Sequence, residues 1–176
     1  MIEREKPDDE AKRAQNNDSN EIEDDDSFFD FDPETVVQDN EKYLREFEQD
    51  LEQAGLKDAT IGRHLFNAEL FLNTWLAEHE GLTMEEGLEY MDEFLGDWYI
   101  RRCMWSTPAN IKSTAASLKK FYKSMADHGH IGAADHKALV SEIKSELPEW
   151  QRRCWLYNDP NTEWEDIAGE FGFPIF

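Results

Sequence analysis

The stretch that decides the fold is residues 106–125, which read STPANIKSTAASLKKFYKSM. Ser106 or Thr107 can cap a helix, and Pro108 suits the first turn that follows the cap. Apolar side chains then recur at steps of three and four residues, which places them on one face of a helix. This predicted buried face consists of Ile111, Ala115, Leu118, Phe121, Tyr122 and Met125.

The same helical period runs through the rest of the chain, and no segment alternates as a strand does. One helix is predicted from Asp32 or Pro33 to Ala54, with Gly55 as its stop, and a second follows Asp58 as N-cap and ends near Gly81. A third is predicted to open at the capping-box pattern Thr83-Met84-Glu85-Glu86 and to continue to Trp98. A fifth is expected over about 135–147, with Pro148 ending or kinking it. The predicted fold class is all-α, a single compact bundle of four to five helices.

The sequence divides into a helical domain and two tails. Residues 1–32 are rich in acidic side chains and poor in apolar ones, and they predict a disordered tail. Its aromatic residues Phe28, Phe29 and Phe31 either dock on a partner or fold back onto the domain. The domain is expected over residues 33–157. An aromatic tail follows over 158–176, where the spacing from Trp164 to Phe171 predicts a short amphipathic turn that either covers an apolar patch or serves as a docking arm.

The charge is large and unevenly distributed. Against 18 basic side chains stand 40 acidic ones, a net charge of −22, of which residues 1–40 carry half. Such a surface excludes a general nucleic-acid coat and disfavours an anionic membrane. Residues 98–126, however, contain six Lys or Arg and no acidic residue, so one sector of the domain is basic.

Motifs of enzymes and metal sites are missing from the sequence. There is no glycine-rich phosphate loop and no nucleophile elbow. The spacing of His128, His130 and His136 matches no standard zinc pattern. We therefore expect no catalytic residue, no metal and no cofactor, and a protein that is not an enzyme. Two cysteines, no membrane span and no secretory signal favour a cytoplasmic location with reduced thiols.

The basic sector is the sharper functional signal. Lys112, Lys119 and Lys123 are separated by seven and four residues, which places them on one helical stripe beside Lys120. Arg101 and Arg102 precede this helix, and the second helix adds polar and basic residues near its N-terminus, where anions are favoured. The alternative is an ordinary solvated lysine face. The predicted contacts to double-stranded DNA are Arg63, Asn67, Arg101, Arg102, Lys112, Lys119, Lys120 and Lys123.

The order of these features resembles a known family. Gly55-Leu56-Lys57-Asp58-Ala59-Thr60-Ile61 is followed by Trp75-Leu76, Trp105-Ser106, Leu118-Lys119-Lys120-Phe121-Tyr122-Lys123 and Gly129-His130-Ile131. Over roughly residues 36–132 this is similar to the N-terminal, SAM-like core-binding domain of tyrosine recombinases, the phage-type integrases. The resemblance implies a helical domain that grips one side of a DNA duplex with its second and fourth helices.

Two departures from the family limit what the resemblance implies. Only 44 residues follow Gly132, too few for the family's catalytic domain, and Asp58 stands where the family usually has Ser. The prediction is therefore a non-catalytic DNA-binding module linked to DNA integration or recombination. The alternative is a protein-interaction module on the same fold that docks through Phe28–Phe31 or Trp164–Phe171. The acidity could also reflect a high-salt cytoplasm, in which case it says little about function.

Overall fold

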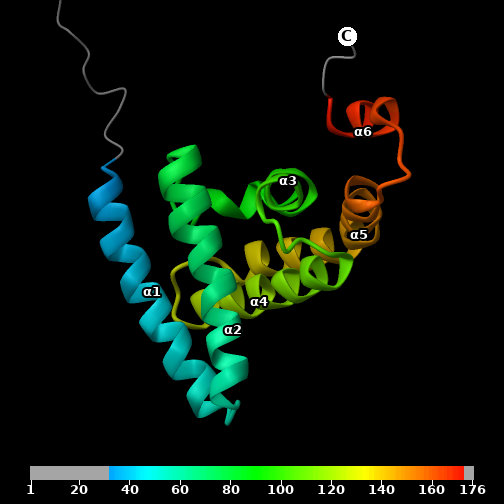
Figure 1. The fold of residues 1–176 in the computed structure, drawn as a ribbon. Coiled ribbons are helices and arrows are strands. Elements are labelled where there is room, and N and C mark those ends of the chain that lie inside the picture. The colour runs from blue at the N-terminus through cyan, green and yellow to red at the C-terminus, as the bar shows by residue number, and fades with distance from the viewer. Residues whose placement is uncertain (1–31, 173–176) are drawn as a thin grey trace, which may run out of the picture. The chain divides into compact units, whose positions relative to one another are not determined.

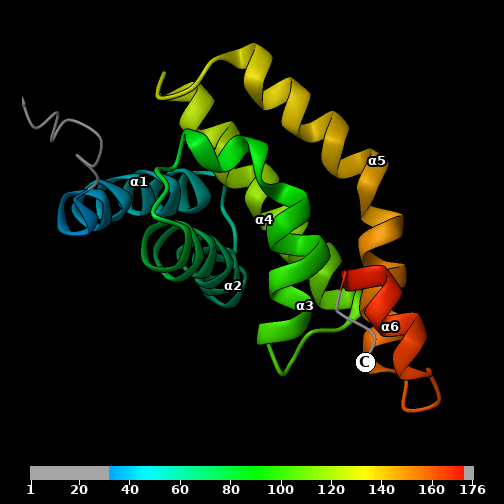
Figure 2. The same cartoon turned by 90° about the horizontal axis from the view of Figure 1, so that it is seen from above.

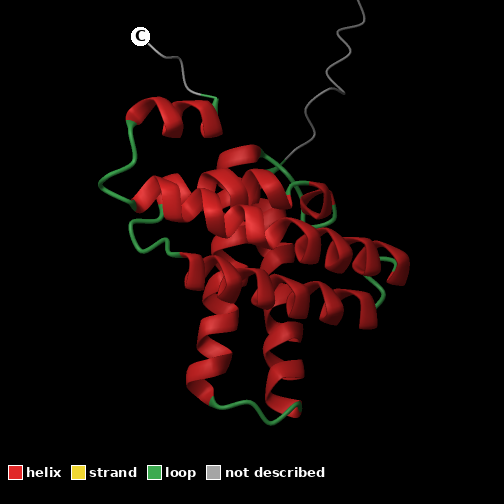
Figure 3. Cartoon of the chain, turned by 90° about the vertical axis from the view of Figure 1, so that its right-hand side faces the viewer, coloured by secondary structure: helices red, strands yellow, loops and turns green. Residues whose placement is uncertain are grey.

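The computed structural model describes residues 32–172, and these form helices and loops without a strand (Figure 3). The all-α prediction is confirmed for this part of the chain. The predicted acidic tail up to residue 31, with Phe28, Phe29 and Phe31, lies outside the described residues, as do residues 173–176. The elements are α1 (Pro33–Gln53), α2 (Asp58–Glu69), η2 (Leu70–Glu80), η3 (Glu86–Glu89), η4 (Asp92–Trp98), α3 (Tyr99–Arg102), α4 (Pro108–Asp127), α5 (Ala133–Asn158) and α6 (Trp164–Phe171).

α1 begins and ends where its sequence signals predict. The Asp32 side chain accepts a hydrogen bond of 3.2 Å from the Glu34 amide, and Gly55 has a φ of 71° just beyond the helix, a conformation that favours glycine. α1 then lies alongside the long helix that follows it (Figure 1). The two are joined by the buried Asn40, whose amide donates to the Leu72 carbonyl at 3.2 Å and to Asn73 at 2.9 Å.

The second helix runs without interruption from α2 into η2 and changes from α to π turns at Leu70. It ends at Gly81, which has a φ of 69°, as predicted. The prediction that Asp58 caps this helix was wrong. Lys57 occupies the N-cap position without a side-chain bond, and Asp58 is the first helical residue, where its charge still suits the helix dipole.

The segment predicted as one helix from Thr83 to Trp98 is divided in two. The capping box forms, since the Thr83 amide donates to Glu86 at 2.8 Å, but it opens only the short 3₁₀ helix η3. A new helix then comprises η4 and α3. The Tyr122 hydroxyl donates to the Met84 carbonyl at 2.8 Å, so the first piece is held against α4 instead of continuing along the helix axis.

α4 lies between α2 and α5 (Figure 2) and begins as predicted, with the Thr107 hydroxyl accepting from the Asn110 amide at 3.1 Å. Its predicted inner face, Ile111 to Met125, is buried throughout. α5 does not end at Pro148 but continues for ten residues to Asn158, and it bends along its course (Figure 2). Proline removes one backbone donor without removing the packing of Trp150 and Cys154, which are both buried.

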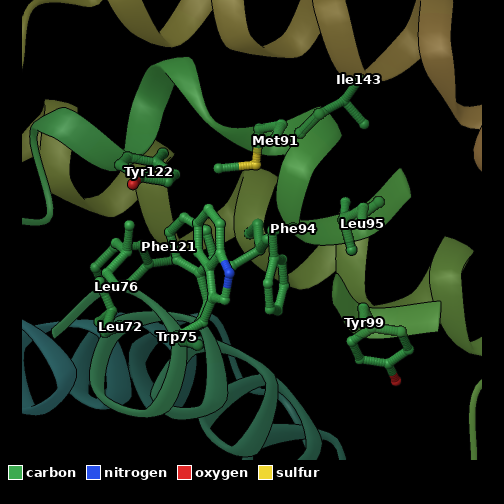
Figure 4. Packing of buried hydrophobic residues seen from close by; sticks show 14 of the residues in the cluster. Leu72, Trp75, Leu76, Met91, Phe94, Leu95, Tyr99, Phe121, Tyr122 and Ile143 are labelled. Carbon is green, nitrogen blue, oxygen red and sulfur yellow. The ribbon is translucent and has the colours of Figure 1, made fainter. Parts of the chain in front are cut away.

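Aromatic side chains dominate the core. Trp75 and Phe71 of η2 meet Phe94 of η4 with ring centroids 5.1 Å and 4.9 Å apart, and Tyr122 of α4 closes the cluster (Figure 4). Phe47 of α1 reaches the same core edge-on through Phe121, at 5.5 Å. One continuous core therefore connects α1, η2, η4 and α4. Neither buried cysteine forms a disulfide, and burial raises the pKa of the Cys103 thiol to about 11.

α6 confirms the short amphipathic helix predicted from Trp164 to Phe171. Ala168 is buried, the Phe171 ring lies 5.6 Å from that of Tyr157, and Glu170 accepts from Arg152 at 2.5 Å. Of the two alternatives for this segment, the structure therefore favours the one in which it covers the bundle, here α5. Within residues 32–172, no helix has the length and apolar content to cross a membrane.

Substitution of glycine by alanine should have opposite effects on stability at two helical positions, Gly96 and Gly62. A Cβ at Gly96 would lie 2.7 Å from the Trp150 ring and 2.7 Å from Asp92, whereas a Cβ at Gly62 would meet nothing within 4 Å. Gly96→Ala should lower the free energy of unfolding by about 1–3 kcal/mol through overpacking. Gly62→Ala should raise it by up to about 1 kcal/mol, because alanine is the better helix former. Urea unfolding of both variants checks the pair, and equal effects would contradict this account of η4 against α5.

Candidate nucleic-acid interface

The outer face of α4 carries the predicted lysines. Lys112, Lys120 and Lys123 are exposed and Lys119 is half-buried, while the small residue Ala116 between them is also exposed. Because the opposite face of α4 is buried in the core, these four side chains share the remaining surface of the helix. The structure thus places them together, as the spacing predicted.

α2 packs against α4 through a buried polar network centred on Ser117. The Ser117 hydroxyl donates to the Ser113 carbonyl at 3.1 Å and accepts from the Asn67 amide at 2.9 Å. His64 Nδ1 lies 2.8 Å from the same oxygen, which leaves Nδ1 as the donor. The hydroxyl thereby uses its one proton and both lone pairs, and the three side chains tie α2 to α4.

This network gives Asn67 a structural role that was not predicted. Its side chain is only 5% exposed, and its amide is committed to Ser117. Asn67 therefore holds two helices together, and it reaches the surface only in the wall of a small hollow. The sequence showed a polar residue on the second helix, but only the packing of α4 shows which way it faces.

Arg63 of α2 and Lys120 of α4 both lie near the ring of His64. The pKa of His64 lies below its usual value, mainly because the ring is buried and further because Arg63 and Lys120 place positive charge beside it. A single ring thus feels a cation from α2 and a cation from α4. Both cations are exposed, and the helices that carry them pack against each other.

Two of the predicted cations are neutralised at the edges of the basic sector. Arg101 donates to both carboxylate oxygens of Asp97, with 2.6 Å between Nε and Oδ1, and Lys123 pairs with Asp127. Asp97 and Asp127 are the acidic residues that bound the acid-free segment on either side. No ion pair within the described part of the chain engages Arg63, Arg102, Lys112, Lys119 or Lys120. These five residues therefore carry the uncompensated charge.

Exposed apolar side chains next to this surface were not predicted from the sequence. Phe66 is 50% exposed and Trp105 48%, with their rings 6.1 Å apart, and Met104 next to Trp105 is 97% exposed. A hollow of about 170 Å³ lies beside them, with Arg63, Asn110 and Ser113 in its wall. One signal was available, because Phe66 lies outside the apolar stripe of Ile61, Leu65, Ala68 and Leu72.

A larger hollow of about 900 Å³ lies between residues 82–90 and the beginning of α5. Its wall carries five carboxylates, from Glu85, Glu86, Glu89, Asp135 and Glu142. Burial, together with the nearby Glu93, Asp92 and Glu146, raises the pKa of Glu142. A phosphate would be repelled there, which leaves the α2–α4 surface as the better place for an anionic ligand.

The histidines after α4 have structural partners. His128 Nε2 lies 3.1 Å from Asp50, and His130 Nε2 lies 2.6 Å from Glu46, so both connect the α4–α5 loop to α1. Among residues 32–172, no three histidine, cysteine or acidic side chains gather closely enough to hold a metal ion.

Comparisons with known protein families, curated proteins and solved structures found no match to the chain.

The position of His64 predicts a pH effect on stability. Because its pKa is lowered in the folded state, the unfolded chain takes up a proton first as the pH falls below about 6.5. Stability is therefore lost from that pH downward. His64→Asn keeps a donor toward Ser117 and removes the titration, so its free energy of unfolding should fall less than that of the wild type between pH 7.5 and 5.5. Urea titrations at both pH values measure the difference, and parallel losses would refute the assignment.

Proposed function

We propose that the chain is a DNA-binding module that holds a duplex by its phosphates through α2 and α4. The observation that carries the proposal is that two helices packed against each other both carry cations without an ion pair among the described residues, Arg63 on α2 and Lys112, Lys119 and Lys120 on α4. Lysine and arginine side chains of this kind supply charge to the phosphate backbone and do not read base sequence. Arg102 adds a further uncompensated cation at the end of α3.

The proposal extends to the type of fold and to the process served. The order of the long helices supports a bundle of the SAM-like core-binding type, in which the second and fourth helices face DNA. Here those helices are α2 with η2, and α4. We therefore propose a role in DNA integration or recombination, as a module that binds DNA and does not cleave it. The alternative, a protein-interaction module, is less well supported at Trp164–Phe171 because that segment already packs on α5.

Salt dependence tests the phosphate contacts. Binding of a short blunt duplex should weaken steeply as salt rises, and Lys112→Ala with Lys120→Ala should reduce the slope of log K against log salt by roughly 2, about one for each lost contact. The matched control is Lys137→Ala with Lys144→Ala, two exposed lysines of α5 that change the net charge equally. Fluorescence anisotropy measures both. Equal slopes for the two double variants, or no binding at low salt, would reject the proposal.

Removal of residues 1–31 gives a second test. These residues contain 12 acidic and 4 basic side chains, and the deletion retains the α1 cap at Asp32. Their net negative charge competes with phosphate for the same cations, so the shortened chain should bind the duplex more tightly at low salt. At about 1 M salt, charges are screened over roughly 3 Å and the difference should vanish. A shortened chain that binds no better at low salt would contradict a phosphate-binding surface.

A further inference from the structure

Three exposed apolar side chains gather at one place, and we call them the aromatic patch: Phe66, Met104 and Trp105. In the part of the chain that the structure describes, only two other large apolar side chains are as exposed, Trp155 and Trp164. Single exposed apolar residues are ordinary, but a cluster of them beside a hollow marks a binding surface. The patch lies where α2, the 103–107 loop and the beginning of α4 meet, next to Arg63.

Hydrogen bonds fix the backbone of the loop that carries Trp105. The side-chain amide of Asn110 donates to the Trp105 carbonyl at 2.7 Å, and the buried Ser106 hydroxyl donates to the Ile100 carbonyl at 2.9 Å. Asn158 of α5 donates to the Ser106 carbonyl at 3.3 Å. The backbone that carries Trp105 is thus anchored at this residue and at the one after it. A ring on an anchored backbone needs less ordering when it binds a ligand.

The geometry of the aromatic patch suits one flat ring. The planes of Phe66 and Trp105 are inclined by 54°, so neither ring covers the face of the other. The adjoining hollow of about 170 Å³ is smaller than the roughly 300–1,000 Å³ of a typical small-molecule site. Asn110 and Ser113 in its wall offer polar groups to the edge of a ring that enters it.

The positive charge around the aromatic patch restricts the class of ligand that the patch can bind. Arg63 lines the hollow, Arg102 and Lys112 lie nearby in sequence, and no acidic residue occurs between positions 98 and 126. A ligand that combines a flat ring with negative charge fits both properties. An unpaired nucleotide has this combination, because its base presents a face for stacking and its phosphates carry charge.

We propose that the aromatic patch binds an unpaired nucleobase, which stacks on Trp105 or Phe66 while Arg63 and Lys112 hold the neighbouring phosphates. This inference rests on the proposed DNA binding and specifies its substrate class. A duplex that contains an unpaired base should bind better than a fully paired one. Stacking tolerates any base, so the preference is for structure and not for sequence.

The experiment compares two probes with the full chain at low salt. One is a short blunt duplex, and the other is the same duplex with a single bulged thymidine. Wild-type protein should bind the bulged probe about tenfold more tightly, the effect expected of one stacked base. Phe66→Ala with Trp105→Ala should bring the ratio of the two affinities close to one and leave the blunt duplex within about twofold of wild type. Circular dichroism confirms that the variant is folded.

The control variant is Trp155→Ala with Trp164→Ala, which removes two equally exposed aromatic side chains outside the basic sector and should keep the preference. Equal affinity of the wild type for both probes, or a preference that survives in the Phe66/Trp105 variant, would overturn the inference. If the blunt duplex still bound with a slope that depends on Lys112 and Lys120, the proposed function would stand without it. Binding of an acidic aromatic peptide at the aromatic patch, with neither DNA probe bound, would overturn both.

Discussion

The packing of α4 between α2 and α5 is the constraint on which the other surfaces depend. Its apolar face is wide, from Ile111 to Met125, and it packs into the core and against the two neighbouring helices. What remains of α4 is a narrow outer strip, and the sequence fills that strip with lysine and alanine. The basic surface is therefore the necessary complement of the core, and it could not move without repacking three helices.

The net negative charge of the molecule is distributed unevenly over the chain. Half of the net −22 belongs to the first forty residues, most of which lie outside the described structure. Inside residues 32–172, carboxylates surround the hollow beside α5, while Asp97 and Asp127 each neutralise one cation at the border of the basic sector. Five of the cations without an ion pair in this part of the chain, Arg63, Arg102, Lys112, Lys119 and Lys120, belong to α2, α3 and α4. In the proposed function, this arrangement favours a few phosphate contacts over broad attraction to any polyanion.

Local signals allowed much of the fold to be predicted. The caps at Asp32 and Thr107, the stops at Gly55 and Gly81 and the buried stripe of α4 depend on residues close together in sequence, and all were found. The errors at Asp58, at the end of α5 and in the division of the third helix arose where packing overrode a local preference. The hydrogen bond from the Tyr122 hydroxyl to the Met84 carbonyl is one such contact, and residues 38 positions apart cannot be paired from periodicity alone.

The candidate site divides in the same way. Lysines on one helix follow from spacing, whereas the burial of Asn67 and the exposure of Phe66 depend on how α2 is rotated against α4. Neither rotation nor helix pairing can be read from one segment. The exposure of Phe66 and Trp105 is not expected from residue type, because a large apolar side chain is usually buried.

Ser117 has a consequence for how the molecule would respond to a ligand. Its hydroxyl is saturated by three partners on two helices, so a shift of one helical turn, about 5.4 Å, would break the bonds from His64 and Asn67 together. The helices cannot slide past each other in small steps. The backbone positions that carry Arg63 and Lys120 are consequently coupled, so a ligand that displaced one helix along the other would have to break the whole network.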